Sequence, residues 1–346
     1  MKKIIKSRKL YYYTEDEEEE RDSRRLFYLL IVLAFTGIML STTTYAWFTT
    51  NRIVTVGNID VKVQTEGSLE ISADGSDWKT LVDYNNIISV HDTSYRTSTN
   101  QLPGFIKPVS TVGELDNNGF MQMYLGVISS DVEGNYTITS TRETDKEENG
   151  EETTGNYLAF DIFLRTTATK DLYLTNESRL FYNGNSTGTE NATRVAFIVE
   201  GNVPTGSDLG TIQSLFTVNT NNVYIWEPNY DTHTNNGVEN ARTVYNITTT
   251  ETNAEALSYD GIKTTFNDQV QLSNAKASVY PNYFDTVNPQ IKTTKDNTAY
   301  QPLFTLTEGV TKVRVYMWLE GQDVDCENNA SIGNLTLALQ FSTNPS

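Results

Sequence analysis

Cysteine, histidine and basic residues are scarce in this sequence, and each shortage excludes a class of protein. With one cysteine, Cys326, among 346 residues, the chain cannot form an internal disulfide, so a hydrophobic core must stabilise its fold. The two histidines, His91 and His233, are far apart and neither begins a His-Glu-x-x-His motif, which excludes a zinc peptidase of that type. The 26 lysines and arginines are outnumbered by 44 acidic residues, for a net charge of −18. Because phosphate binding needs a basic surface, a nucleic-acid partner is not expected.

Motifs of other enzyme classes are also missing. The sequence contains no Gly-x-Ser-x-Gly nucleophile turn and no phosphate-binding glycine loop. Cys326 stands between Asp325 and Glu327, whose negative charges disfavour the reactive thiolate. We therefore predict that the chain is not an enzyme.

One long apolar run determines the predicted location of the chain. Residues 26–48 contain no charged side chain, and at a rise of about 1.5 Å per residue a helix over them would extend roughly 30 Å, the thickness of a bilayer's hydrocarbon core. Lysine and arginine are concentrated before this run, so the positive-inside rule places residues 1–25 in the cytoplasm as a charged tail. Residues 49–346 are then predicted to be extracellular or displayed at the cell surface.

The fate of the apolar run has two interpretations. Thr44 and Ala46 are small residues at the positions that signal peptidase recognises, so cleavage would leave Trp47 as the new N-terminus. The run is longer than the ~7–15 apolar residues of an ordinary signal peptide, which favours a retained transmembrane helix instead. Signal peptidase is the predicted partner in the first case, and the membrane is the partner in the second.

The end of the apolar run and the residues after it carry a family resemblance. The residues YAWFT at 45–49, followed by VGNIDVKV at 56–63, resemble the export signal and first strand of the TasA and camelysin family. Its members are biofilm-matrix and cell-surface proteins of Gram-positive bacteria that a SipW-type signal peptidase processes. The resemblance implies a secreted matrix or surface protein in which the end strand of one subunit completes the sheet of the next. The peptidase activity reported for camelysin is not expected, because the metal-binding motif is missing.

The exported part has the periodicity of β-strands. Ile59, Val61 and Val63 alternate with polar residues, as in a strand with one buried face. Residues 157–164 are apolar on both faces, which predicts a central strand that is covered on both sides. We predict an all-β fold, a jelly-roll-like β-sandwich, with a loop-rich insertion at about 201–298 where turn residues predominate.

The acidic segment near the C-terminus is the one candidate metal site. Asp323, Asp325 and Glu327 place carboxylates at alternate positions, and Ca²⁺ prefers such oxygen ligands. The segment lacks the glycine and the terminal bidentate glutamate of an EF-hand loop. The two interpretations are a calcium site and a solvated turn between two strands. No other cofactor is predicted.

Two hypotheses of function remain. In the first, the protein is a structural or accessory subunit of an extracellular matrix or fibre, and it assembles with copies of itself or with related matrix subunits. The donor strand would come from residues 47–64, with Ile59, Val61 and Val63 as its apolar face. In the alternative, the protein is a membrane-tethered monomer whose loops bind a glycan, a wall polymer or a host protein. Cleavage after Ala46 favours assembly, and a retained helix favours tethered display.

Overall fold

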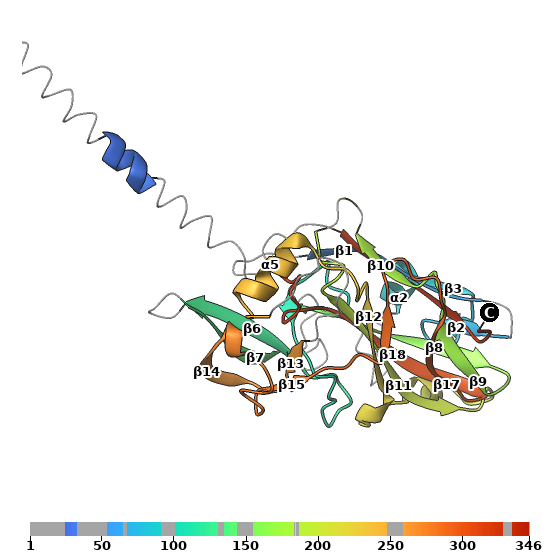
Figure 1. Cartoon of the computed structure of the whole chain (residues 1–346). Helices are drawn as coiled ribbons and strands as arrows, with labels where there is room; N and C mark the ends of the chain where they lie inside the picture. The colour runs from blue at the N-terminus through green and yellow to red at the C-terminus, as the bar shows by residue number, and fades with distance from the viewer. Residues whose placement is uncertain are drawn as a thin grey trace, which may run out of the picture. The chain divides into compact units, whose positions relative to one another are not determined.

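A computed structural model describes residues 25–32, 54–64, 68–90, 101–130, 135–143, 155–182, 184, 187–247, 259–327 and 334–345 (Figure 1). The chain divides into two compact units, residues 1–44 and residues 45–346, and each is described by itself.

In the first unit, residues 25–32 form a helix whose side chains are exposed. Among the described residues, no helix is both long enough and apolar enough to cross a bilayer. The rest of the predicted 26–48 segment, which includes the predicted cleavage residues Thr44, Ala46 and Trp47, lies outside the described residues.

The second unit is mostly β-structure, which confirms the predicted all-β class, and its first large sheet contains both the first and the last strand. The strands are ordered β17-β9-β19-β1-β3, with β10 beside β19 and β4 beside β1. They are β1 (Val54–Val63), β3 (Leu81–Asp83), β4 (Phe105–Ile106), β9 (Lys170–Leu174), β10 (Arg179–Tyr182), β17 (Gln301–Leu306) and β19 (Asn334–Ser342). The predicted alternation in β1 is confirmed, because Ile59, Val61 and Val63 are buried whereas Lys62 is exposed.

The second large sheet is covered on both faces. Its order is β16-β12-β11-β18-β8-β2, with β5 beside β18. The strands are β2 (Glu70–Ser72), β5 (Pro108–Val109), β8 (Leu158–Thr166), β11 (Thr193–Val203), β12 (Val223–Pro228), β16 (Ile291–Thr293) and β18 (Gly309–Glu320). Every residue of β18 is buried, and in β8 only Arg165 is not, which confirms the central covered strand expected from the apolar pattern at 157–164.

The two large sheets pack face to face around one main core. Ile59 and Leu337 from the first sheet and Phe160 and Val315 from the second belong to the same cluster of buried side chains. Burying one such side chain contributes roughly 1.5–3 kcal/mol, so this shared cluster is the principal stabilising element of a chain that has one cysteine.

The predicted insertion at 201–298 is more ordered than its turn-rich sequence indicates. Strands β12 and β16 from this stretch join the second large sheet. Another part of it packs with a hairpin from earlier in the chain around a smaller core that includes Tyr124, Phe266 and Phe284. The strands of this part are β6 (Met123–Ser130), β7 (Tyr136–Glu143), β13 (Asp260–Ile262), β14 (Phe266–Gln271) and β15 (Phe284–Thr286).

In the described part of the second unit, the helices are short and lie in the connections. They are α2 (Tyr84–Ser89), α4 (Leu209–Gln213), α5 (Asn235–Thr243) and the 3₁₀ turns η1 (Thr220–Asn222) and η2 (Leu272–Asn274). The longest of them, α5, begins after Thr234, whose hydroxyl accepts a hydrogen bond from the Gly237 amide at 2.9 Å. This cap satisfies one of the amides that a helix leaves unpaired at its N-terminus.

Candidate functional site

The acidic segment that follows β18 is buried. Asp323, Asp325 and Glu327 are 3 %, 0 % and 0 % exposed, so the interpretation as a solvated turn is wrong. The chain turns tightly here, because the Asp323 amide donates to the Glu320 carbonyl at 3.1 Å and the Cys326 amide donates to the Asp323 carbonyl at 3.0 Å. Buried carboxylates need compensating charges or donors, and residues 320–330 contain no lysine or arginine.

Arg194 of β11 supplies the compensating charge. Its Nη2 lies 2.5 Å from Asp323 Oδ2 and 2.6 Å from Glu227 Oε1, and the Arg194 side chain is itself fully buried. Nη1 donates to the carbonyl of Asn191 at 2.7 Å. Burial alone would lower the pKa of Arg194, but the carboxylates of Glu227 and Asp323 raise it above its usual value. The guanidinium therefore stays charged, and it joins β11, β12 and the acidic segment.

Asp325 holds the start of α5. Its Oδ2 lies 2.8 Å from His233 Nδ1, and its Oδ1 accepts from the amide and the hydroxyl of Thr234, both at 2.9 Å. A Cβ at Gly237 would collide with Oδ1, so only glycine allows this approach. Burial raises the pKa of Asp325, whereas the hydrogen bond from His233 opposes that shift. A carboxylate at this place also interacts favourably with the positive end of the helix dipole.

Two of the three predicted calcium ligands come together in a candidate metal group, but their oxygens already have donors. His233, Asp323 and Asp325 offer ligand atoms within 4.8 Å of one another, and Glu327 is not part of that group. The Asp323 oxygens accept from Arg194 and from the Asp325 amide, and the Asp325 oxygens accept from His233 and Thr234. Ca²⁺ takes 6–8 oxygen ligands, so it would have to displace these donors beside a buried guanidinium. The residues present therefore do not fit Ca²⁺.

Adding calcium is expected to leave the melting temperature of the purified protein unchanged within error. If the protein had a calcium site, a calcium concentration of 100 times its Kd would stabilise the fold by about 2.7 kcal/mol. Differential scanning fluorimetry detects a change of that size easily. Magnesium serves as the ionic-strength control. A rise of several degrees that Asp325→Ala abolishes would restore the calcium interpretation.

Glu320, the last residue of β18, is a further buried carboxyl directly before the acidic segment. Its oxygens accept from Trp318 Nε1 at 3.0 Å and from the Gln322 amide at 3.1 Å. Burial raises its pKa to about 7, although these hydrogen bonds oppose the shift. The acidic segment is thus preceded by a carboxyl that is partly protonated near neutral pH.

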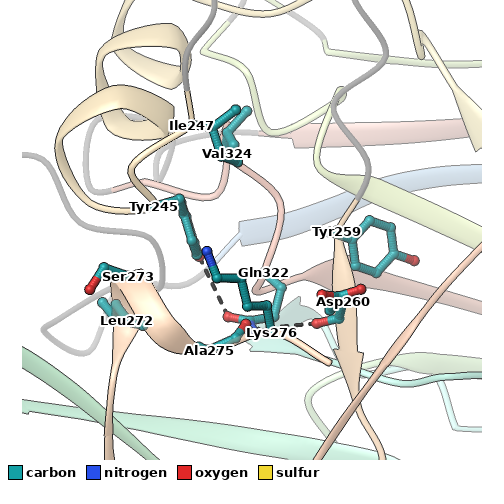
Figure 2. Close-up of a pocket in the computed structure, with 10 residues that line it drawn as sticks. All are labelled: Tyr245, Ile247, Tyr259, Asp260, Leu272, Ser273, Ala275, Lys276, Gln322 and Val324. Atoms are coloured by element: carbon teal, nitrogen blue, oxygen red, sulfur yellow. Dashed lines mark hydrogen bonds between the residues drawn. The ribbon is translucent and has the colours of Figure 1, made fainter. Parts of the chain in front are cut away.

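A small cavity of about 200 Å³ lies where the acidic segment meets the insertion (Figure 2). Figure 2 shows the side chain of Gln322 between Tyr245 and the backbone at Ala275 and Asp260. Its amide nitrogen donates to the carbonyls of Ala275 and Asp260 at 3.2 and 3.4 Å, and its oxygen lies 3.5 Å from Tyr245 Oη. These bonds fasten the insertion to the end of β18, which is a structural role.

The structure places these predicted site residues in two separate groups. Ile59, Val61 and Val63 lie together on the buried face of β1, and the three acidic residues lie in one buried segment. Sequence reasoning missed Arg194 and His233, which are the partners of those acids. The sequence contains one signal for Arg194. It stands directly before the apolar run 195–199, and a charged residue in such a buried stretch needs a buried partner of opposite charge.

Comparisons with known proteins identify no relative: no family model, no curated protein and no solved structure matches the chain.

Proposed function

We propose that residues 49–346 form a structural or accessory subunit of an extracellular matrix or fibre on a Gram-positive cell surface, and that subunits assemble by exchanging β1. The position of β1 is the observation that supports this proposal. It runs parallel to β19 from Thr55 to Val63, where Val63 is the partner of Phe341, and it pairs antiparallel with β3 on its other side. Strand β1 thus lies between β19 and β3 and is hydrogen-bonded to both.

Exchange of β1 between two copies would have a small free-energy cost. A parallel pair cannot be closed by a hairpin, so β1 and β19 are joined by backbone hydrogen bonds and side-chain packing rather than by a turn. After Gln64 the chain continues to β2, which belongs to the other large sheet. The same strand from a second copy would make the same contacts, and such swapping is a low-cost route to assembly.

The jelly-roll topology of the two large sheets is part of the same proposal. We interpret the two large sheets, with their shared core and the antiparallel series β12-β11-β18-β8, as a jelly-roll-like sandwich. Three parallel pairs, β1 with β19, β12 with β16 and β18 with β5, depart from a wholly antiparallel jelly roll. The first of these pairs includes the strand assigned to exchange.

The tethered monomer remains the second candidate, and one observation favours it. A hollow of about 330 Å³ is lined largely by polar side chains, among them Asn176, Arg179, Asn229, Lys295 and Asn297. Amide and charged side chains of this kind hydrogen-bond to sugar hydroxyls. A glycan or wall polymer is the ligand that this hollow would suit.

Removing β1 tests the assembly proposal. Protein that begins at Trp47 is expected to form oligomers in light scattering, whereas protein that begins at Thr65 is expected to stay unassembled and to bind a labelled 47–64 peptide. The peptide carrying Val61→Asp is the matched control, and it should not bind because it would bury an unpaired charge. The proposal fails if the Trp47 form stays monomeric at every concentration and the peptide does not bind.

A further inference from the structure

A second cluster of buried charges lies on the outer face of the second large sheet, away from the main core. Asp161 of β8 is the partner of Arg314 in the neighbouring strand β18, and Lys312 lies two residues before Arg314, on the same face of the sheet. Glu200 of β11 occupies the register shift between Val199 and Gly201, beside the same stretch of β18. All four charged side chains are at most 3 % exposed. Their role is not explained by the acidic segment or by β1.

The lysine amine of this cluster faces the carboxyl of Asp161 directly. Lys312 Nζ lies 3.3 Å from Asp161 Oδ2, 3.1 Å from the Gln213 carbonyl and 3.0 Å from the Leu215 carbonyl. A neutral amine has two N–H groups and one lone pair. When the two carbonyls accept those N–H groups, the lone pair points at the Asp161 carboxyl.

Arg314 is placed to assist an attack on that carboxyl. Its Nε lies 3.1 Å from Asp161 Oδ1, the oxygen on the side away from Lys312, and 3.6 Å from Glu200 Oε1. A donor in this position stabilises the negative charge that Oδ1 gains when a nucleophile adds to Cγ, as oxyanion holes do in acyl transfer.

The balance of buried charge favours condensation of the Lys312 amine with the Asp161 carboxyl. Burial lowers the pKa of Lys312, although Asp161 opposes the shift, and burial raises the pKa of Glu200 to about 6. An amide between Lys312 and Asp161 removes one positive and one negative charge from a site without water. Arg314 and Glu200 remain as a balanced pair, so no charge is left uncompensated.

We propose that Lys312 and Asp161 form an intramolecular isopeptide bond in the folded chain. The ammonium first passes a proton to Asp161 Oδ2, and the neutral Nζ then attacks Cγ. The Nζ–Cγ bond forms, a second proton moves from Nζ to Oδ2, and the Cγ–Oδ2 bond breaks to release one water molecule. No oxidant, cofactor or second substrate is required. The reaction needs only the folded arrangement, which holds the two groups in contact and excludes water.

The cross-link would join β8 to β18 in the middle of the second large sheet. It would close a long loop between residues 161 and 312, and closing a loop in the unfolded chain stabilises the folded state in the way that a disulfide does. A chain with a single cysteine has no disulfide to serve this purpose. The proposal is independent of strand exchange, because β1 belongs to the other sheet.

Mass spectrometry of the full chain tests the bond. Protein recovered unfolded from inclusion bodies is expected to become lighter by one water molecule when it is refolded from urea, whereas the same protein kept in urea is not. Tryptic digestion should then yield a branched peptide in which residues 147–165 are joined to residues 296–314, because trypsin does not cut after an acylated lysine. The Lys312→Arg protein keeps the positive charge and should show neither change.

Lys79 provides the internal control, because its Nζ lies only 2.8 Å from Asp77 in an ion pair that water reaches. The tryptic peptide 63–79 should keep its full mass. The proposal is overturned if folded wild-type protein keeps its full mass after prolonged incubation and trypsin cuts it after Lys312. Loss of water that persists in Lys312→Arg would equally overturn the assignment to these two residues.

Discussion

Replacing Arg194 with alanine is expected to lower the free energy of unfolding by about 3–5 kcal/mol, the usual cost of leaving buried charges without their partner. The guanidinium contacts both Asp323 and Glu227, and both carboxylates are almost inaccessible to water. Natural domains have about 5–15 kcal/mol of stability in total, so this single change removes a large fraction of it. Urea denaturation followed by tryptophan fluorescence measures the loss.

A surface ion pair provides the control for the Arg194 experiment. Lys79 and Asp77 are in contact, but both side chains are well exposed, and such pairs contribute roughly 0–1 kcal/mol. Lys79→Ala is therefore expected to unfold at nearly the wild-type urea concentration. An equally small effect of Arg194→Ala would show that the acidic segment does not depend on the guanidinium.

Changing Val61 to aspartate is expected to displace β1 from its sheet, and so to lower the stability of the chain as well as to prevent assembly. Val61 is fully buried in the centre of β1, between Leu339 of β19 and Val82 of β3. A carboxylate there would be buried without a partner, at a cost of several kcal/mol. Circular dichroism and urea denaturation measure the outcome.

The adjacent position provides the matched control for Val61. Lys62 lies in the same strand but is exposed, so Lys62→Asp places the same side chain in water and should change stability by less than about 0.5 kcal/mol. If Val61→Asp protein keeps the wild-type stability, β1 contributes less to its own sheet than its burial indicates. If it keeps that stability but fails to assemble, the strand is needed between subunits rather than within one.

Strands with strong alternation could be predicted from the sequence, because their pattern is local. The buried positions Ile59, Val61 and Val63 of β1 follow the period of two, and β8 was recognisable from apolar residues on both faces. Strand order was not predictable in the same way. The parallel pairing of β1 with β19 joins the two ends of the unit, and no local pattern encodes a partner that is more than 270 positions away.

The acidic segment shows where local patterning misleads. Three alternating acids between two strands have the composition of a solvated turn, and that interpretation was wrong because Arg194 and His233 approach from distant strands and loops. The charges of β18 could not be interpreted for a similar reason. Lys312 and Arg314 alternate with core residues, and their acidic partners lie on β8 and β11.

The turn-rich stretch at 201–298 was the least predictable part of the fold. Its strands are short, and β13, β15 and β16 have three residues each, too few for a period to emerge. Strands β13 and β15 are held by the smaller core around Phe266, and Gln322 also donates to the Asp260 carbonyl of β13, whereas β16 pairs with β12 in the second large sheet. Tertiary contacts therefore decide the structure there.

Locking β1 into its own sheet tests the central claim most directly. Asp60 and Ala338 are direct partners in the parallel pair, and neither is fully buried, so Asp60→Cys with Ala338→Cys can form a disulfide at the Cα separations that strand pairs provide. Cys326 is buried and should not interfere. Light scattering of protein that begins at Trp47 should show monomers in the oxidised form and assembly after reduction. Assembly at the same rate in both forms would contradict exchange of β1.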